Sequence, residues 1–117
     1  MKAYTDIEQS QTLKKILPLE SADMEWLIDY YGLEEPFSLP VKDRVSANEE
    51  PCWSLSALLD VLPKNYGKYT KSLYWFDDGW HCEYLDEDGE GFKGETADNP
   101  VDACVEMIIK LKELKLL

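Results

Sequence analysis

The clearest periodic pattern of apolar positions lies near the end of the chain, from Asn99 to Leu114. Apolar residues recur there at helical spacing and cover a face wider than one sheet contact needs. Asn99 suits the N-cap and Pro100 the first helical position, with Asp102 near the positive end of the dipole. We therefore predict a helix over about 100–114, covered by a sheet and by either another helix or a second copy of the chain.

Two other segments carry helical signals. Thr5 with Glu8 has the form of a capping box, which predicts a shorter N-terminal helix over about 6–17, ended by Pro18. A second main helix is expected over about 52–62, because prolines flank a stripe of leucines at helical spacing. That stripe consists of Leu55, Leu58, Leu59 and Leu62.

Alternating apolar and polar residues predict strands in the first half of the chain. Residues 24–30 permit a short helix or a strand, and their aromatic and β-branched side chains favour the strand. A turn is expected at 32–36, followed by an edge strand at 37–41, since Pro40 cannot donate a backbone hydrogen bond. Loops are expected at 42–50 and 64–72.

The strongest strand signal is a hairpin in which 73–77 and 80–85 flank Asp78-Gly79, a dipeptide that favours a type I′ turn. The two-residue turn predicts the pairs Asp77–Trp80, Phe76–His81, Trp75–Cys82, Tyr74–Glu83 and Leu73–Tyr84. One face then contains Leu73, Trp75, Trp80, Cys82 and Tyr84, and we expect it to pack under the closing helix. The other face contains Tyr74, Phe76, His81, Glu83 and Leu85.

The second face of this hairpin is more apolar than a solvent face requires. Either the helix expected at 51–62 covers it, or it is an exposed patch for a partner or for self-association. Tyr74, Phe76 and His81 are therefore the candidate interaction surface.

A turn at 86–89 and a strand at 91–95 lead into the closing helix. Taken together, the pattern predicts one α+β domain over residues 1–117. It should contain an antiparallel sheet of about three to five strands, the two main helices and the shorter N-terminal helix.

Charge narrows the classes of partner. Twenty-four acidic residues oppose twelve basic ones, for a net charge of −12. This disfavours direct binding to nucleic acid or to an anionic membrane and suits a basic protein partner. The sequence contains no long apolar run and no paired-cysteine spacing, and we expect no leader segment. We expect a cytoplasmic protein with buried free thiols, one disulfide plus a leftover thiol being the alternative.

Candidate chemistry is sparse. His81 and Cys82 are neighbours on a strand and point to opposite faces, so they cannot share a metal ion. A nucleophilic pair would require Cys52 or Cys104 to reach His81. The acidic run 86–90 resembles the start of a calcium loop but lacks its later ligands. We predict no catalytic residue, no cofactor and no metal site.

Three groups of segments carry a resemblance. They are Ile7-Glu8-Gln9-Ser10 with Leu17-Pro18 and Ser21-Ala22-Asp23-Met24; Pro51-Cys52-Trp53-Ser54-Leu55 through Val61-Leu62-Pro63; and Asn99-Pro100-Val101-Asp102-Ala103-Cys104-Val105-Glu106-Met107. They resemble small uncharacterised proteins of Bacteroides-type gut bacteria and their phages or mobile elements. The resemblance implies no activity but favours an accessory role of the phage or mobile-element type. The order of strands, Gly94-Glu95-Thr96 and helix is similar to HicB-type antitoxin domains.

The functional prediction is a non-enzymatic protein-interaction module or accessory factor, whose partner is another protein or a second copy in a homodimer. One alternative is an acidic protein that mimics nucleic acid and inhibits a DNA-binding protein. Another is a small enzyme that uses His81.

Overall fold

The computed structural model describes residues 1–28, 34–39 and 50–117, and these residues have an α+β fold. The elements are α1 (Ile7–Lys14), the 3-10 helix η1 (Leu19–Ser21), β1 (Met24–Ile28), β2 (Glu34–Ser38), β3 (Pro51–Cys52), α2 (Leu55–Val61), β4 (Asn65–Tyr66), β5 (Tyr69–Phe76), β6 (Gly79–Leu85), β7 (Gly91–Ala97) and α3 (Pro100–Glu113). None of the described helices is long and apolar enough to cross a membrane.

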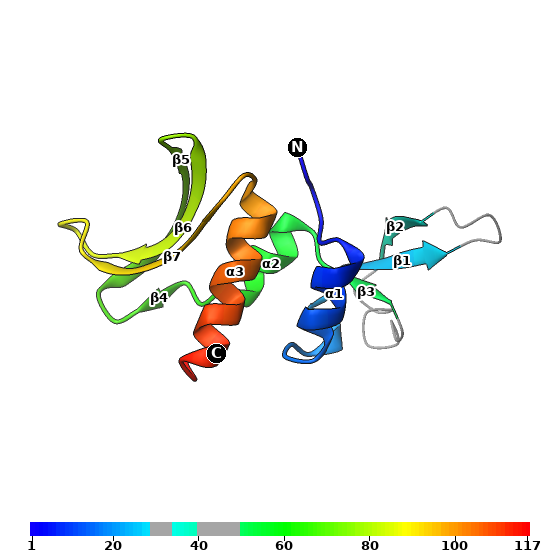
Figure 1. Ribbon diagram of the computed structural model, residues 1–117. Coiled ribbons are helices and arrows are strands. Elements are labelled where there is room, and N and C mark those ends of the chain that lie inside the picture. Colours follow the sequence, from blue (N-terminus) through cyan, green and yellow to red (C-terminus); the bar gives the residue numbers. More distant parts are fainter. Residues whose placement is uncertain (29–33, 40–49) are drawn as a thin grey trace. The chain divides into compact units, whose positions relative to one another are not determined.

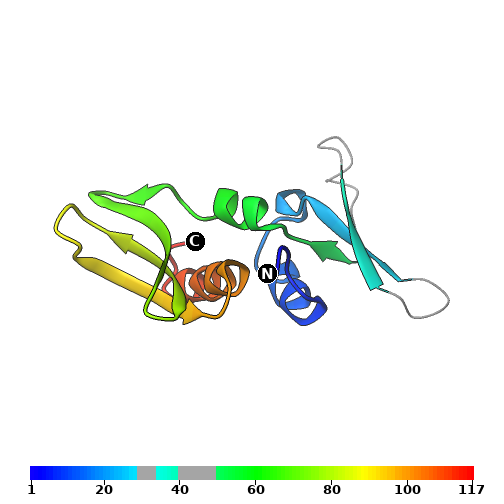
Figure 2. The ribbon, with the colours of Figure 1, turned by 90° about the horizontal axis from the view of Figure 1, so that it is seen from above.

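The described strands form two antiparallel sheets (Figures 1 and 2). One has the order β2-β1-β3 and the other β4-β5-β6-β7. The chain divides into two compact units, residues 3–57 and residues 58–117 with Met1 and Lys2. The predicted α+β class is confirmed, although the sequence pattern did not indicate two sheets. The single domain over 1–117 stays a prediction.

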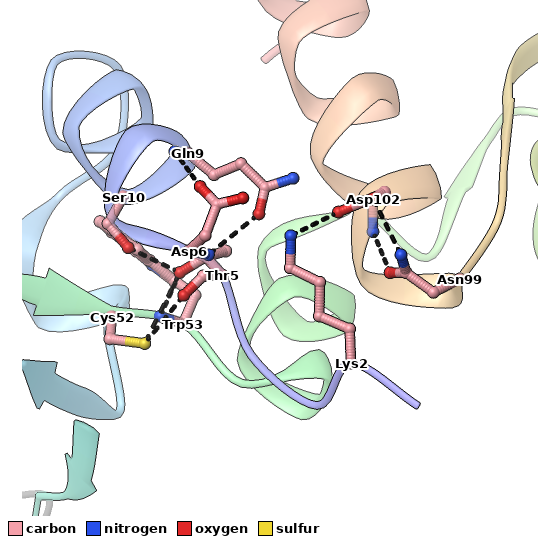
Figure 3. A network of polar contacts seen from close by, with 9 residues as sticks. All are labelled: Lys2, Thr5, Asp6, Gln9, Ser10, Cys52, Trp53, Asn99 and Asp102. Atoms are coloured by element: carbon pink, nitrogen blue, oxygen red, sulfur yellow. Dashed lines mark hydrogen bonds and ion pairs between the residues drawn. The ribbon is translucent and has the colours of Figure 1, made fainter. Parts of the chain in front are cut away.

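The N-terminal helix begins one residue later than predicted. The N-cap is Asp6, whose Oδ1 accepts from the Gln9 N–H at 2.7 Å, while Gln9 Oε1 accepts from the Asp6 N–H at 3.1 Å (Figure 3). The predicted capping box of Thr5 with Glu8 is wrong because Thr5 is buried and its hydroxyl lies 2.8 Å from that of Ser10. The α-helix also ends at residue 14 rather than 17.

The sheet of the first unit confirms a strand at residues 24–28. Residues 29–33 and 40–49 lie outside the described residues, and with them parts of the predicted strands, turn and loop. The turn expected at 32–36 is wrong for its last three residues, because β2 already begins at Glu34. β2 contains Pro36 and lies at the edge of its sheet, where a strand tolerates proline.

The second main helix begins later than predicted. Pro51 and Cys52 form the short strand β3, and Cys52 pairs with Met24 of β1. Ser54 then starts the helix, since its hydroxyl accepts from the Ala57 N–H at 3.2 Å in the manner of an N-cap. The apolar stripe thus predicted the helix correctly, but it did not indicate that Cys52, at the start of the predicted range, lies in a strand.

The central hairpin has a different turn from the predicted one. Asp77 and Asp78 occupy the two turn positions with φ of 52° and 62°, as a type I′ turn requires. Phe76 therefore pairs with Gly79 rather than with His81, and the predicted register is wrong. The observed pairs are Phe76–Gly79, Trp75–Trp80, Tyr74–His81, Leu73–Cys82, Ser72–Glu83, Lys71–Tyr84 and Thr70–Leu85.

The error in register leaves the two faces of the hairpin unchanged. The observed partner of each β5 residue lies two positions away in β6 from the predicted partner. Side chains alternate between faces with a period of two, so both registers put the same side chains on each face. The strand is nevertheless longer than predicted, because β5 begins at Tyr69 after a turn in which Gly67 has a φ of 61°. The loop expected at 64–72 is therefore wrong for residues 65–66 and 69–72, which lie in strands. The strand predicted at 91–95 is confirmed and extends to Ala97.

The closing helix α3 has the predicted position and cap. Asn99 Oδ1 accepts from the Asp102 N–H at 2.9 Å, and Asn99 Nδ2 donates to Asp102 Oδ2 at 2.8 Å (Figure 3). Lys2 Nζ lies 2.8 Å from Asp102 Oδ1 and completes the network. The buried residues of α3 are Pro100, Val101, Ala103, Cys104, Val105, Met107, Ile108 and Leu111. Since all eight are already buried within one chain, the apolar arc does not need a second copy to cover it.

The face of the hairpin expected to be core is only partly buried. Cys82 and Tyr84 are fully buried, but Trp75 is 54% exposed, so its assignment to the core is wrong. Gly94 lies where β6 and β7 shift register, and a Cβ there would collide with Cys82 O and Met107 Cε. The absence of a side chain at Gly94 therefore allows α3 to approach this part of the sheet closely.

We expect Asn99→Ala to lower the free energy of unfolding by about 1 kcal/mol, because the first turn of α3 loses its side-chain acceptor. Urea unfolding followed by far-ultraviolet circular dichroism measures the change. Asp98→Ala is the matched control, since Asp98 is exposed and adjacent to the cap. Equal stability of the two variants would contradict the role of this cap.

Candidate functional site

Three consecutive aromatic side chains are exposed at the end of the β5–β6 hairpin. The exposed fraction is 36% for Tyr74, 54% for Trp75 and 65% for Phe76. His81 is half-buried beside them. Of the two alternatives for Tyr74 and Phe76, covered or exposed, the structure agrees with the exposed one. We call Tyr74, Trp75, Phe76 and His81 the aromatic tip.

The rings of the aromatic tip are held by cross-strand contacts on both faces of the hairpin. Tyr74 stacks on His81 with ring centroids 5.2 Å apart, and Phe76 lies 6.3 Å from the same imidazole. On the other face Trp75 meets Trp80 edge to face at 6.1 Å. Such pairs stabilise a hairpin and restrict the positions of its side chains. The tip is thus an ordered surface with an aromatic ring on each side.

Both ring nitrogens of His81 are engaged. Nε2 lies 3.0 Å from the carbonyl oxygen of Phe76, which only accepts, so Nε2 carries the proton and donates it. Nδ1 lies 3.1 Å from the Thr96 hydroxyl and 3.6 Å from Glu83 Oε1. The imidazole therefore connects the last residue of β5 to β6 and β7.

Glu83 is a buried acid under the aromatic tip, with 4% of its surface exposed. The Tyr74 hydroxyl donates to Glu83 Oε2 at 2.7 Å. This hydrogen bond, with some burial and the nearby negative charge, raises the pKa of Tyr74 above its usual value. The sequence placed Glu83 on the correct face but did not indicate that it is buried.

The backbone of β5 has an unpaired stretch beside the aromatic tip. β4 pairs only with Tyr69 and Thr70, and the Lys71 N–H donates to Lys64 O at 3.1 Å. Beyond this point, no described strand lies along that side of β5; Figure 1 shows β4 at the end of β5 opposite the turn. We call the stretch from Leu73 to Phe76 the open edge.

The turn at the end of the hairpin is acidic. Asp77 and Asp78 are both exposed and directly follow Phe76. The next hairpin, between β6 and β7, also has an acidic turn, but there Asp86 Oδ1 accepts from the N–H groups of Asp88 and Glu90, each at 2.9 Å. The first of these acidic turns adjoins the exposed rings of the aromatic tip.

Cys82 and Cys104, the two cysteines in the unit of His81, do not assemble with its imidazole. Cys52, Cys82 and Cys104 are all buried and free, as predicted. A hydrogen bond with Cys82, together with burial, raises the pKa of Cys104, and both thiols lie on the face of β6 opposite His81. In the other unit burial raises the pKa of Cys52 to about 11, and its thiol donates to Thr5 O at 3.5 Å.

No group of three metal-ligating side chains occurs within residues 1–28, 34–39 and 50–117. Comparison of the chain with protein-family models, with curated proteins and with solved structures found no match.

The structure brings all three predicted residues, Tyr74, Phe76 and His81, together on one face. It adds Trp75 on the other face, which the sequence analysis had assigned to the core. One signal was present: three successive aromatic residues in a strand put large rings on both faces at one point. Beyond the two residues that pair with β4, β5 has β6 as its only described neighbouring strand, and its rings are exposed on both faces there.

We expect Tyr74→Phe to lower the free energy of unfolding by about 1 kcal/mol at neutral pH, since buried Glu83 loses a hydrogen-bond donor. The pKa of Tyr74 is raised in the folded state. The contribution of this hydrogen bond to the free energy of unfolding is therefore fully present below the unfolded tyrosine pKa of about 10. It is lost as pH rises through the pKa of Tyr74 in the folded state.

Urea unfolding of both proteins between about pH 7 and pH 11 measures this difference, which should narrow with rising pH. Ser72→Ala, on the same face of β5, is the control and should show no such trend. A gap between wild type and Tyr74→Phe that stays constant or widens would contradict the assignment.

Proposed function

We propose that this protein is a non-enzymatic protein-interaction module that contacts its partner through the aromatic tip. The observation that carries the proposal is the exposure of three successive aromatic rings in an ordered hairpin. Aromatic residues are enriched at protein interfaces because they bury much area with little loss of side-chain entropy. Exposed aromatic rings that the fold holds in place therefore suit recognition better than they suit a solvated surface.

The contacts of His81 support a binding function over a catalytic one. A general base needs a free nitrogen within reach of a substrate proton. His81 uses Nε2 to hold Phe76 O, and its Nδ1 lies beside Thr96 and Glu83. The carboxylate of Glu83 is buried and accepts from Tyr74. These groups support the shape of the aromatic tip.

The cellular role that we propose is that of an accessory factor of the phage or mobile-element type, acting in the cytoplasm. The support is the sequence resemblance described above, together with three buried cysteines that are all free thiols. Free cysteines are typical of reducing compartments. The net charge of −12 favours a protein partner over nucleic acid.

We expect Phe76→Ser and Trp75→Ser each to weaken retention of the partner by at least about tenfold, because truncating a central aromatic residue removes a large share of interface energy. The test is quantitative co-purification with the tagged full chain from a lysate of its native host. Phe37→Ser is the matched control, since Phe37 is a strand phenylalanine of the other unit with 44% exposure.

Circular dichroism establishes that each variant is folded. A partner that is lost from the two tip variants but retained by the control supports the proposed surface. Equal retention by all three variants would show that the aromatic tip is not the contact surface.

A further inference from the structure

We infer that the open edge binds an extended, lysine- or arginine-bearing segment of the partner protein as an additional β-strand. This inference rests on the proposed function and specifies the chemistry of the partner. It combines three independent features of the hairpin: an unpaired backbone edge, exposed aromatic rings on both faces and an acidic turn beside them.

The hydrogen-bonding pattern of the hairpin determines which groups face the open edge. Next to a two-residue turn, the flanking pair Phe76–Gly79 exchanges both backbone hydrogen bonds, and such pairs then alternate along an antiparallel ladder. Leu73 and Trp75 therefore direct their N–H and C=O groups away from β6. The Lys71 N–H, two residues earlier, follows this alternation by donating to Lys64 O. An added strand would continue the line that β4 begins.

Among the residues that the structure describes, the open edge lacks the features that normally prevent strand addition. Exposed edges are usually protected by lysine, proline, a bulge or a covering loop. The segment Leu73-Tyr74-Trp75-Phe76 contains neither a charge nor a proline. The nearest lysine in β5, Lys71, has its ammonium 2.6 Å from Leu59 O and so does not extend over this segment. The edge is both accessible and chemically suited to pairing.

Side chains of an added strand would alternate between the two faces of the hairpin. On one face they would meet Tyr74 and Phe76, and on the other Trp75. Cationic side chains bind the faces of aromatic rings, and they also reach the carboxylates of Asp77 and Asp78. The alternation thus gives a basic strand favourable contacts on both sides.

Charge separates this partner from a second copy of the chain. Two copies would each bring a net charge of −12 and an acidic turn to the same edge. Like charges placed together are unfavourable, whereas opposite charges also accelerate association. The same backbone geometry could pair β5 with β5, but the surrounding charges favour a basic segment.

The test uses the full chain and three synthetic peptides as probes. The first alternates lysine with valine, the second alternates glutamate with valine, and the third has proline in place of each valine of the first. Nuclear magnetic resonance follows the backbone amides. We expect only the lysine–valine peptide to shift the amides of Leu73 and Trp75 and to slow their exchange with solvent.

Paired substitutions test the contribution of the acidic turn. The double substitution of Asp77→Asn with Asp78→Asn should weaken binding of the lysine–valine peptide about fivefold, because two exposed ion pairs with the peptide are lost. Asparagine tolerates the positive φ of both positions, so the turn is retained. Glu87→Gln with Asp88→Asn removes the same charge from the other acidic turn and should leave the affinity unchanged.

The inference is overturned if the lysine–valine peptide does not bind, or binds no better than the glutamate or proline peptide. It is also overturned if both paired substitutions weaken binding equally. If sedimentation shows a dimer without peptide, and the amides of Leu73 and Trp75 in that dimer exchange slowly by nuclear magnetic resonance, the edge belongs to a second copy and the inference is overturned. If the lysine–valine peptide does not bind but Phe76→Ser still abolishes retention of the partner, the proposed function stands and only the added strand is excluded. If Phe76→Ser, Trp75→Ser and Phe37→Ser all retain the partner equally, the proposed function is excluded as well.

Discussion

The alternation of side chains along β6 is the constraint on which the second unit depends. Cys82 and Tyr84 point to the side of α3 and are fully buried, while His81 and Glu83 point to the other side. Because the period of a strand is two, one register assigns all four residues at once. A slip of one residue would turn Glu83 into the apolar core beneath α3 and expose Cys82 and Tyr84. Burial therefore excludes a one-residue slip in the pairing of β5 with β6, whereas a shift of two residues leaves the same side chains buried.

The end of the chain shows what local sequence can predict. Asn99 and Pro100 indicate the start of α3 by chemistry that acts within one helical turn, and the structure has that cap. The turn of the central hairpin shows where such signals fail. Asp78-Gly79 is the stronger turn dipeptide, yet Gly79 lies in β6, where a Cβ would collide with Thr96 of β7. Packing against β7 thus gives the glycine at position 79 a reason other than the turn, which the local pattern could not indicate.

Some features of the candidate site were likewise predictable from the local sequence, and others were not. Alternation alone grouped Tyr74, Phe76 and His81 on one face, which required no knowledge of the fold. The exposure of Trp75 and the existence of the open edge were not predictable from this pattern. They depend on where β4 ends and where α3 lies, and both follow from long-range packing. The burial of Glu83 was missed because carboxylates are rarely buried unless a partner compensates them.

That compensation also orders the aromatic tip. Glu83 requires the Tyr74 hydroxyl, and this hydrogen bond fixes the direction of the tyrosine ring. The Phe76 carbonyl oxygen lies 3.0 Å from His81 Nε2, and this contact holds the end of β5 to β6. Apolar side chains in place of these buried polar groups are often as stable or more stable, so stability alone does not account for them. The polar contacts instead keep an aromatic surface ordered, beside an edge that the described part of the chain leaves unpaired.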